Sequence, residues 1–215
     1  MEEILQKIEK AVYEGDCDSV KALCERALKE NISPSLILEK GLIAGLRKIG
    51  EEWARGEAFL PSVLSSAAAM KEGISIIEPE MIKRKEKAKY LGKVIIGTVK
   101  GDIHDIGKNL VAVMLSAEGF EVHDLGVDVP ENLFVEKVRE IRPDIIGLSA
   151  LMTSTMIEQK TVIDALKRAG LRDFVKVMVG GAPVTARWAE EIGADGYAEN
   201  AYEAVKLAKR LVGRD

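Results

Sequence analysis

The hydrophobic pattern changes its period near residue 93, and this change constrains the fold more than any other feature of the sequence. From Lys93 onward, short apolar runs rich in β-branched residues alternate with segments whose apolar residues recur every three to four positions. The apolar runs cover residues 93–99, 120–126, 143–151, 175–181 and 194–199. The first helical segment ends near Gly119. The other four cover residues 130–141, 155–170, 184–192 and 201–212. Continuous apolar runs are typical of parallel strands covered on both faces, so we expect five βα units.

Five such units predict a doubly wound, flavodoxin-like (Rossmann-like) α/β domain with a five-stranded parallel sheet in the order 2-1-3-4-5. In this fold a ligand binds outside the carboxyl ends of the strands, where the winding reverses between strands 1 and 3. The segments that follow strands 1, 3 and 4 are "TVKGDIHDIGKNL" (98–110), "SALMTSTM" (149–156) and "GGAP" (180–183). We therefore expect these three polar or glycine-containing segments to converge at one edge of the sheet.

The first 82 residues show helical periodicity only, in four segments separated by short breaks. Their apolar positions are Ile4, Leu5, Ile8, Ala11 and Val12; Val20, Leu23, Cys24, Ala27 and Leu28; Leu38, Leu42, Ile43, Leu46, Ile49 and Trp53; and Val63, Leu64, Ala67, Ala68, Met70, Ile74 and Ile77. The pattern predicts an all-α four-helix bundle, with Phe59 in its core. The charged run that follows is typical of a solvated linker. We expect a helical cap domain (1–82), a linker (83–92) and an α/β domain (93–215).

Composition excludes several classes of function. The net charge of −4 and the pI of about 5.5 argue against nucleic-acid binding, which favours a basic face. No apolar run approaches the ~20 residues that span a bilayer, and the charged start "MEEILQKIEK" does not resemble a signal peptide. We expect a cytoplasmic protein without a membrane partner. Cys17 and Cys24 lie too far apart on a helix for a disulfide and are interpreted as small buried apolar residues.

The segment after the first strand places His104 between Asp102 and Asp105, bracketed by Gly101 and Gly107. A phosphate-binding loop is disfavoured, because the glycine spacing is wrong and the two carboxylates would repel a phosphate. A phosphoryl-accepting receiver site is disfavoured too, because the third strand does not end in a carboxylate. Two interpretations stay open on the residues alone. The histidine is either a metal ligand oriented by a carboxylate or a polar loop residue that caps a helix. His123 is assigned no role.

Three motifs in this half resemble the D-x-H-x-x-G … S-x-L … G-G signature of cobalamin-binding domains. They are "DIHDIG", "SAL" (149–151) and "GGA" (180–182), each at the end of the strand that the fold requires. The W-x6-L-P pattern from Trp53 to Pro61 resembles the helical cap of the methyl-carrying members. Nearly the whole chain resembles the corrinoid proteins of methanol and methylamine methyltransferase systems and the cobalamin module of methionine synthase.

This resemblance implies a cobalamin (corrinoid) cofactor with His104 as the lower axial ligand of cobalt, in place of the cofactor's own base. Asp102 would accept a hydrogen bond from the imidazole. Thr155 would be the third member of this hydrogen-bond relay of His104, Asp102 and Thr155, at a position where methionine synthase has serine. Trp53 and Leu60 would cover the upper face of the corrin. The other implied cofactor contacts are Asp105, Ile106, Gly107, Ser149, Leu151, Thr153, Gly180, Gly181, Ala182, Ala198, Glu199 and Asn200.

The function implied is that of a methyl carrier without independent catalytic activity. It would hold a methyl group on cobalt and dock in turn on a substrate-specific methyltransferase and an acceptor methyltransferase, with a reductive activation protein as a further partner. Two alternatives share parts of the signature. A cobalamin-dependent mutase subunit would need a barrel over the cobalt, and a cobalamin-sensing regulator would need an output domain or partner. The residues leave the methyl donor and acceptor open.

Overall fold

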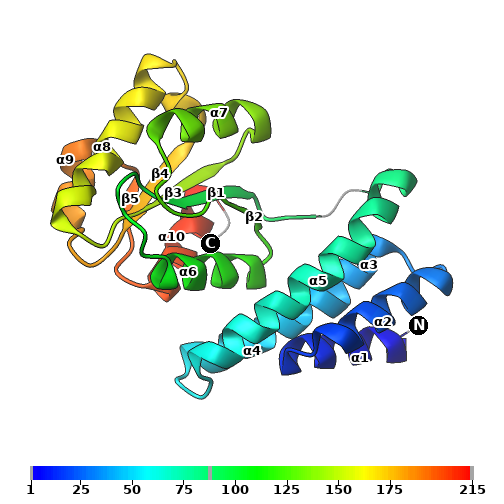
Figure 1. Cartoon of the computed structure of the whole chain (residues 1–215). Coiled ribbons are helices and arrows are strands. Elements are labelled where there is room, and N and C mark those ends of the chain that lie inside the picture. The colour runs from blue at the N-terminus through cyan, green and yellow to red at the C-terminus, as the bar shows by residue number, and fades with distance from the viewer. Residues whose placement is uncertain (1, 87–88, 214–215) are drawn as a thin grey trace. The chain divides into compact units, whose positions relative to one another are not determined.

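The computed structural model describes residues 2–86 and 89–213, and it divides the chain into two compact units (Figure 1). The first, the helical unit, contains α1 to α5. The second, the sheet unit, contains the parallel sheet and α6 to α10. Within the described ranges, no helix combines the length and the apolar character that crossing a bilayer would require.

The helical unit consists of helices whose ends follow local capping chemistry. Asp16 caps α2 by accepting from the Ser19 amide, and Ser33 caps α3 ahead of Pro34 in the first turn. The apolar positions expected in the first helix are all buried. The elements are α1 (Glu2–Glu14), α2 (Cys17–Lys29), α3 (Pro34–Ile37), a π-helical segment (Leu38–Ile43), α4 (Ala44–Ala54) and α5 (Leu60–Arg84).

The third helix differs from the regular helix that periodicity predicts, because its middle is π-helical. Gly41 lies within this π-helical segment and Gly45 lies just after it, and both let the helix approach α1 closely. A Cβ on Gly45 would lie 2.4 Å from the Glu9 carbonyl oxygen, and one on Gly41 would lie 2.8 Å from Ile8. A hydrophobic pattern does not predict backbone contacts of this kind, because it does not count glycine as an apolar position.

Three apolar residues expected in the helical bundle, Phe59, Leu64 and Ala68, are exposed. The prediction for Phe59 is wrong, since it is 77% exposed just before α5 begins, and Leu64 is 40% exposed. The buried face of α5 combines the expected Val63, Met70 and Ile77 with the small residues Ser66, Ala69 and Gly73. A Cβ on Gly73 would lie 2.4 Å from a methyl group of Leu42, so close helix approach contributes to this face alongside apolar side chains.

Residues 83–86 of the charged segment expected to be the linker (83–92) continue the helical unit. Helix α5 continues to Arg84, and the Glu86 carboxylate accepts from the Ser33 hydroxyl at 2.6 Å and the Ser35 amide at 3.1 Å. These bonds tie residue 86 to the start of α3. Residues 87 and 88 lie outside the described residues, and β1 begins at Lys93.

The sheet unit has the predicted flavodoxin-like topology. The strands are β1 (Lys93–Thr98), β2 (Glu121–Asp124), β3 (Ile145–Ser149), β4 (Lys176–Gly180) and β5 (Gly196–Tyr197). They are parallel and lie in the order β2-β1-β3-β4-β5, which confirms the predicted order. Thr98 pairs with Ser149, and Ser149 pairs with Gly180, so the ends of β1, β3 and β4 lie side by side. The three segments singled out in the sequence therefore converge.

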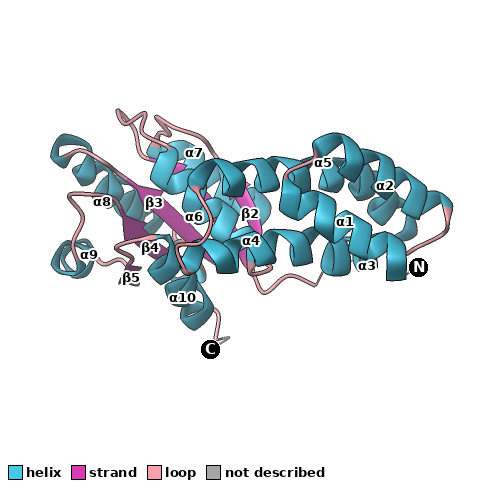
Figure 2. Ribbon diagram, turned by 90° about the horizontal axis from the view of Figure 1, so that it is seen from below, coloured by secondary structure: helices cyan, strands magenta, loops and turns pink. Residues whose placement is uncertain are grey.

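Helices cover both faces of the sheet, as parallel strands require (Figures 1 and 2). Helices α7, α8 and α9 lie on one face, where Phe134, Ile163 and Ile192 join the main apolar core. Helices α6 and α10 lie on the other face. The helices are α6 (Ile106–Ala117), α7 (Glu131–Ile141), α8 (Thr153–Arg168), α9 (Ala186–Ile192) and α10 (Ala201–Leu211), and a short 3-10 turn (Arg172–Phe174) precedes β4.

Candidate functional site

The site is built on the loop between β1 and α6, which hydrogen bonds hold at several points. The Thr98 hydroxyl, fully buried at the end of β1, donates to the His104 carbonyl oxygen at 2.9 Å. The Asp128 carboxylate accepts from the Gly101 amide at 2.7 Å, and the Asp128 amide donates to the Asp102 carbonyl oxygen at 2.9 Å. Gly101 has a φ of +79°, a left-handed conformation that favours glycine. The loop conformation is thus fixed from two neighbouring strands.

Asp102 is a fully buried carboxylate at the centre of this loop. Its Oδ1 faces the His104 Nδ1 at 2.7 Å and accepts from the His104 amide at 3.1 Å. Its Oδ2 accepts from the Thr155 hydroxyl at 2.7 Å and the Leu151 amide at 2.8 Å. Burial alone would raise the pKa of Asp102, but the bonds from Thr155, Leu151 and His104 together hold that pKa well below its usual range. Asp102 is therefore an ionised acceptor.

The carboxylate fixes the tautomer of His104. Because ionised Asp102 can only accept, the Nδ1 of His104 carries the proton, and the Nε2 keeps its lone pair. The His104 side chain is 48% exposed, whereas Asp102 behind it is 0% exposed. A half-exposed imidazole with a free Nε2 and a carboxylate on Nδ1 is the arrangement of a metal-binding histidine.

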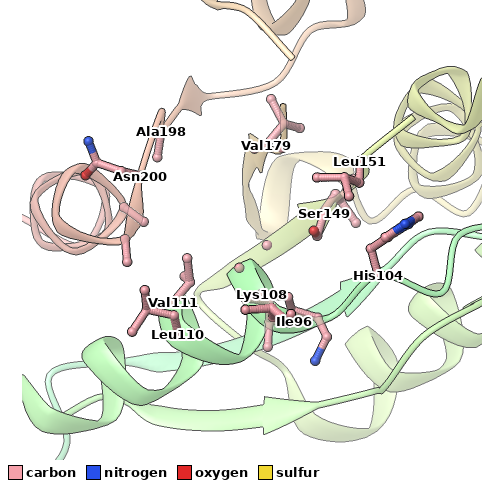
Figure 3. Close-up of a pocket in the computed structure, with 18 of the residues that line it drawn as sticks. Ile96, His104, Lys108, Leu110, Val111, Ser149, Leu151, Val179, Ala198 and Asn200 are labelled. Atoms are coloured by element: carbon pink, nitrogen blue, oxygen red, sulfur yellow. The ribbon is translucent and has the colours of Figure 1, made fainter. Parts of the chain in front are cut away.

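A cavity of about 650 Å³ opens beside His104 and runs between the sheet and helices α6 and α10. Figure 3 shows His104 at one side of this cavity and Ala198 and Asn200 at the opposite side, with Ser149 and Val179 between them. Its walls are mostly apolar or small side chains. The predicted residues that line it are His104, Asp105, Ile106, Gly107, Ser149, Leu151, Gly180, Gly181, Ala182, Ala198, Glu199 and Asn200.

The other predicted site residues lie elsewhere. Asp102 and Thr155 stand behind His104 rather than in the cavity wall. Thr153, expected to line the cavity, is an exposed residue at the start of α8 and is not among the lining residues. Helix α8 begins at this residue, two positions before the predicted start. Trp53 and Leu60 are half-buried residues of the helical unit.

Two glycines of the cavity wall have different structural roles: one allows a close backbone contact, and the other leaves open volume. Gly181 has a φ of +127°, and a Cβ there would lie 1.7 Å from the Ala150 carbonyl oxygen. Gly107 lines the cavity, and a Cβ on it would meet nothing within 4 Å. The glycine at 107 therefore leaves open volume where any side chain would project. The cavity fits a large, mostly apolar ligand that reaches His104.

The donor set fits a metal that brings most of its own ligands. Among the described residues there is no group of three or more His, Cys, Asp or Glu side chains that could hold an ion. His104 therefore offers a single imidazole, which suits the axial position of a metal held in a macrocycle.

Sequence reasoning missed much of the cavity wall. Leu110 and Val111 come from α6, Met178 from β4 and Ala204 from α10. Their helical or strand spacing looks the same as that of ordinary core residues, and only their position at the wall distinguishes them. Lys108 also lines the cavity, and its side chain is 1% exposed and pairs with Asp124 at 2.5 Å. His123, assigned no role, pairs with Glu121 on β2.

Comparison with known proteins identifies the family of the chain. A family model described as the B12 binding domain matches residues 92–206, and a second with the same description matches residues 4–78. The chain therefore belongs to the B12-binding family, and its cofactor is a corrinoid.

Within that family the chain is similar to corrinoid proteins over its full length. It is 51% identical over 208 residues to the trimethylamine corrinoid protein of Methanosarcina barkeri, covering 97% of this chain and 96% of that one. It is 53% identical over 211 residues to dimethylamine corrinoid protein 2 of Methanosarcina acetivorans, covering 98% and 97%. The structure of the methanol:cobalamin methyltransferase complex MtaBC from Methanosarcina barkeri matches with a TM-score of 0.88 at 32% identity, covering 99% of this chain and 81% of that one.

Proposed function

We propose that this protein carries a methyl group on the cobalt of a corrinoid whose lower axial ligand is the Nε2 of His104. The observation that carries the proposal is the position of His104 at the mouth of the cavity, with its Nδ1 held by buried Asp102 at 2.7 Å. That contact leaves Nε2 as the lone-pair donor facing away from the protein interior. The cofactor's own base would then be displaced and would extend with its tail into the cavity.

The size and walls of the cavity support this role. Small residues at 107, 180, 181 and 182 leave room near the His104 loop, and the far side is lined by Ala198, Glu199 and Asn200. An extended nucleotide tail needs such a long, largely apolar space with polar groups at its end. Asp105, Ile106, Ser149 and Leu151 would contact the corrin or the start of the tail.

The protein controls the chemistry through the relay of His104, Asp102 and Thr155. When bound, the corrinoid supplies a cobalt centre that accepts and releases the methyl group. The chain's residues set how strongly His104 donates to that centre. Because the carboxylate holds the Nδ1 proton, it makes the imidazole a stronger ligand and fixes the orientation of its ring. The Thr155 hydroxyl and the Leu151 amide keep the carboxylate ionised and in place.

The proposed domain organisation follows from the same reasoning. Residues 1–82 would form a cap domain in which Trp53 and Leu60 cover the reactive face of the corrin, and residues 93–215 would hold the cofactor. The segment 83–92 would join them and allow the cap to move when a partner enzyme docks. The exposed aromatic ring of Phe59, next to Leu60, supports a surface role for this loop rather than a core role.

The proposed partners are a substrate-specific methyltransferase that loads the methyl group and an acceptor methyltransferase that removes it. A reductive activation protein would restore the cofactor when it is oxidised. The names of the relatives favour methylated amines as the donor class, because two of them at 51% and 53% identity are trimethylamine and dimethylamine corrinoid proteins.

A reconstitution experiment tests the ligand assignment. Protein loaded with hydroxocobalamin and reduced to the cobalt(II) state should show nitrogen ligation by electron paramagnetic resonance. The ligation should be lost in His104→Ala and kept in His123→Ala, the matched histidine control. Unchanged nitrogen ligation in His104→Ala would contradict the proposal.

A methylation assay tests the carrier role. The loaded protein should be methylated when it is mixed with a trimethylamine or dimethylamine methyltransferase and the corresponding amine. Methanol with its own methyltransferase provides the comparison. If the loaded protein shows His104 ligation but none of these enzymes methylates it, the protein binds cobalamin without carrying a methyl group, and the carrier role is contradicted.

A further inference from the structure

A second buried polar cluster lies one helical turn beyond Thr155, and its two side chains, Gln159 and Trp188, neither line the cavity nor belong to the His104 relay. Gln159 on α8 is 0% exposed. Its side-chain Nε2 donates to the Leu148 carbonyl oxygen at 3.0 Å and to the Gly180 carbonyl oxygen at 3.2 Å. Its Oε1 accepts from the Trp188 indole at 3.0 Å. The amide therefore joins α8 to the ends of β3 and β4 and to α9.

The partners determine which way the amide faces. An indole N–H can only donate, and the two backbone carbonyls can only accept. Gln159 satisfies all three only with Oε1 toward Trp188 and Nε2 toward the strands. Trp188 thus fixes the orientation that allows the amide to bind both carbonyls.

The position of Gln159 on its helix connects this cluster to the cobalt ligand. Residues four apart lie on the same face of an α-helix, so Thr155 and Gln159 point from α8 toward the same side of the sheet. Both are buried, at 6% and 0% exposure. Thr155 binds Asp102, whereas Gln159 binds the carbonyl of Leu148, just before the S-x-L segment, and that of Gly180, the first residue of the G-G segment. If α8 rotated or slid, Thr155 would move away from the Asp102 Oδ2.

We propose that Gln159 is a positioning residue for the His104 relay. By anchoring α8 to the Leu148 and Gly180 carbonyls, it sets the helix rotation that brings the Thr155 hydroxyl to Asp102. It also holds Gly180, which lines the cavity. The link to cobalt rests on the proposed function, but the link from Gln159 to the relay can be measured in the protein without cofactor.

The main test compares Gln159→Met with Lys160→Gln. Methionine keeps the side-chain length and removes all three hydrogen bonds. Lys160 is the neighbouring exposed residue, whose ion pair with Asp164 points to solvent. In cofactor-free protein, amide hydrogen exchange at Leu151, which donates to Asp102, should rise about tenfold in Gln159→Met. It should stay at the wild-type rate in Lys160→Gln.

A second readout uses the loaded protein in the cobalt(II) state. Gln159→Met should lower the nitrogen-ligated fraction clearly, while Lys160→Gln leaves it unchanged. The effects of substitutions at Gln159 and Thr155 on the ligated fraction should also be non-additive, because both residues act through one helix. In a Thr155→Val background, Gln159→Met should lower the ligated fraction much less than it does alone. Such non-additivity would not arise from a general loss of stability.

Unchanged Leu151 exchange and unchanged ligation in folded Gln159→Met would overturn the inference. Where Gln159→Met does not fold, Trp188→Phe decides: it keeps an aromatic six-membered ring and removes the orienting N–H together with the five-membered ring of the indole. It should raise Leu151 exchange about threefold, and a wild-type rate would overturn the inference. If His104→Ala keeps nitrogen ligation, the proposed function fails, and the cofactor-free exchange data still decide the role of Gln159.

Discussion

Replacing Thr155 with valine probes the relay from its buried end. Valine keeps the branched shape and removes the hydroxyl that donates to Asp102 Oδ2 at 2.7 Å. Asp102 would then keep three donors, the Leu151 amide and the amide and Nδ1 of His104. A hydrogen bond to a charged, buried group contributes about 1.5–3 kcal/mol. We therefore expect Thr155→Val to lower the free energy of unfolding of the sheet unit by about 2 kcal/mol.

Thr155→Ser separates the hydroxyl from the methyl group. Serine keeps the donor and loses a buried methyl that faces Gly101, where a Cβ would lie 3.7 Å from it. Loss of one buried methyl costs about 1 kcal/mol, so serine should cost less than valine. Thr155→Ser should thus preserve the relay. Ser154→Ala, which changes the adjacent exposed hydroxyl, should stay within about 0.5 kcal/mol of wild type.

Urea unfolding of the cofactor-free protein, followed by circular dichroism, measures all three variants. The expected order of stability is wild type and Ser154→Ala, then Thr155→Ser, then Thr155→Val. If Thr155→Val were as stable as wild type, or more stable than Thr155→Ser, the hydroxyl would not support the buried carboxylate. The reasoning about the relay would then be refuted.

Further predictions concern the cavity, the cap and the cysteines. Gly107→Ala should leave the cofactor-free fold intact yet weaken cobalamin binding in equilibrium titrations. Gly181→Ala should instead lower the free energy of unfolding of the sheet unit by about 3 kcal/mol or more in urea. Equal stability of the two variants would contradict the cavity geometry. Burial raises the pKa of Cys24 to about 12, so only Cys17 should react with a thiol reagent in native protein at pH 8. The buried thiol disfavours folding as pH rises from about 9 toward 12, because the unfolded chain loses its proton first. Trp53→Ala should speed light-driven loss of the cofactor's methyl group with little loss of cofactor binding, and unchanged photolysis would return this residue to a packing role.

The sequence predicted the sheet unit well because its signals are local and unambiguous. The β-branched runs at 93–99 and 145–149 could not form amphipathic helices, and only one common strand order suits five βα units. That order then placed His104, Ser149 and Gly180 at one edge without any knowledge of contacts. The structure confirms the order and brings these segments together.

The helical unit was harder to predict, because its packing depends on small residues. Gly41, Gly45 and Gly73 allow close contacts that replace the apolar side chains a pattern would expect. The exposure of Phe59 follows from its place before the first turn of α5, where no neighbouring helix covers it.

The site could be predicted where a motif marked it and could not where tertiary contacts create it. His104 and Asp102 stand two residues apart in the sequence, so their pairing is a local property of the loop. Gln159 is 55 residues beyond His104, and its glutamine reads as a polar position in an ordinary amphipathic helix. Only its three contacts with Leu148, Gly180 and Trp188 show that it is a structural anchor.

The central claim is that His104 ligates cobalt through its imidazole nitrogen, and isotope labelling tests it most directly. The protein is produced with ¹⁵N-histidine, loaded with unlabelled cobalamin and reduced to the cobalt(II) state. Nitrogen splitting in the electron paramagnetic resonance spectrum should change from the triplet of ¹⁴N to the doublet of ¹⁵N, and it should disappear in labelled His104→Ala. A triplet that persists in the labelled protein would show that the cofactor's own base is the ligand, which would contradict the account.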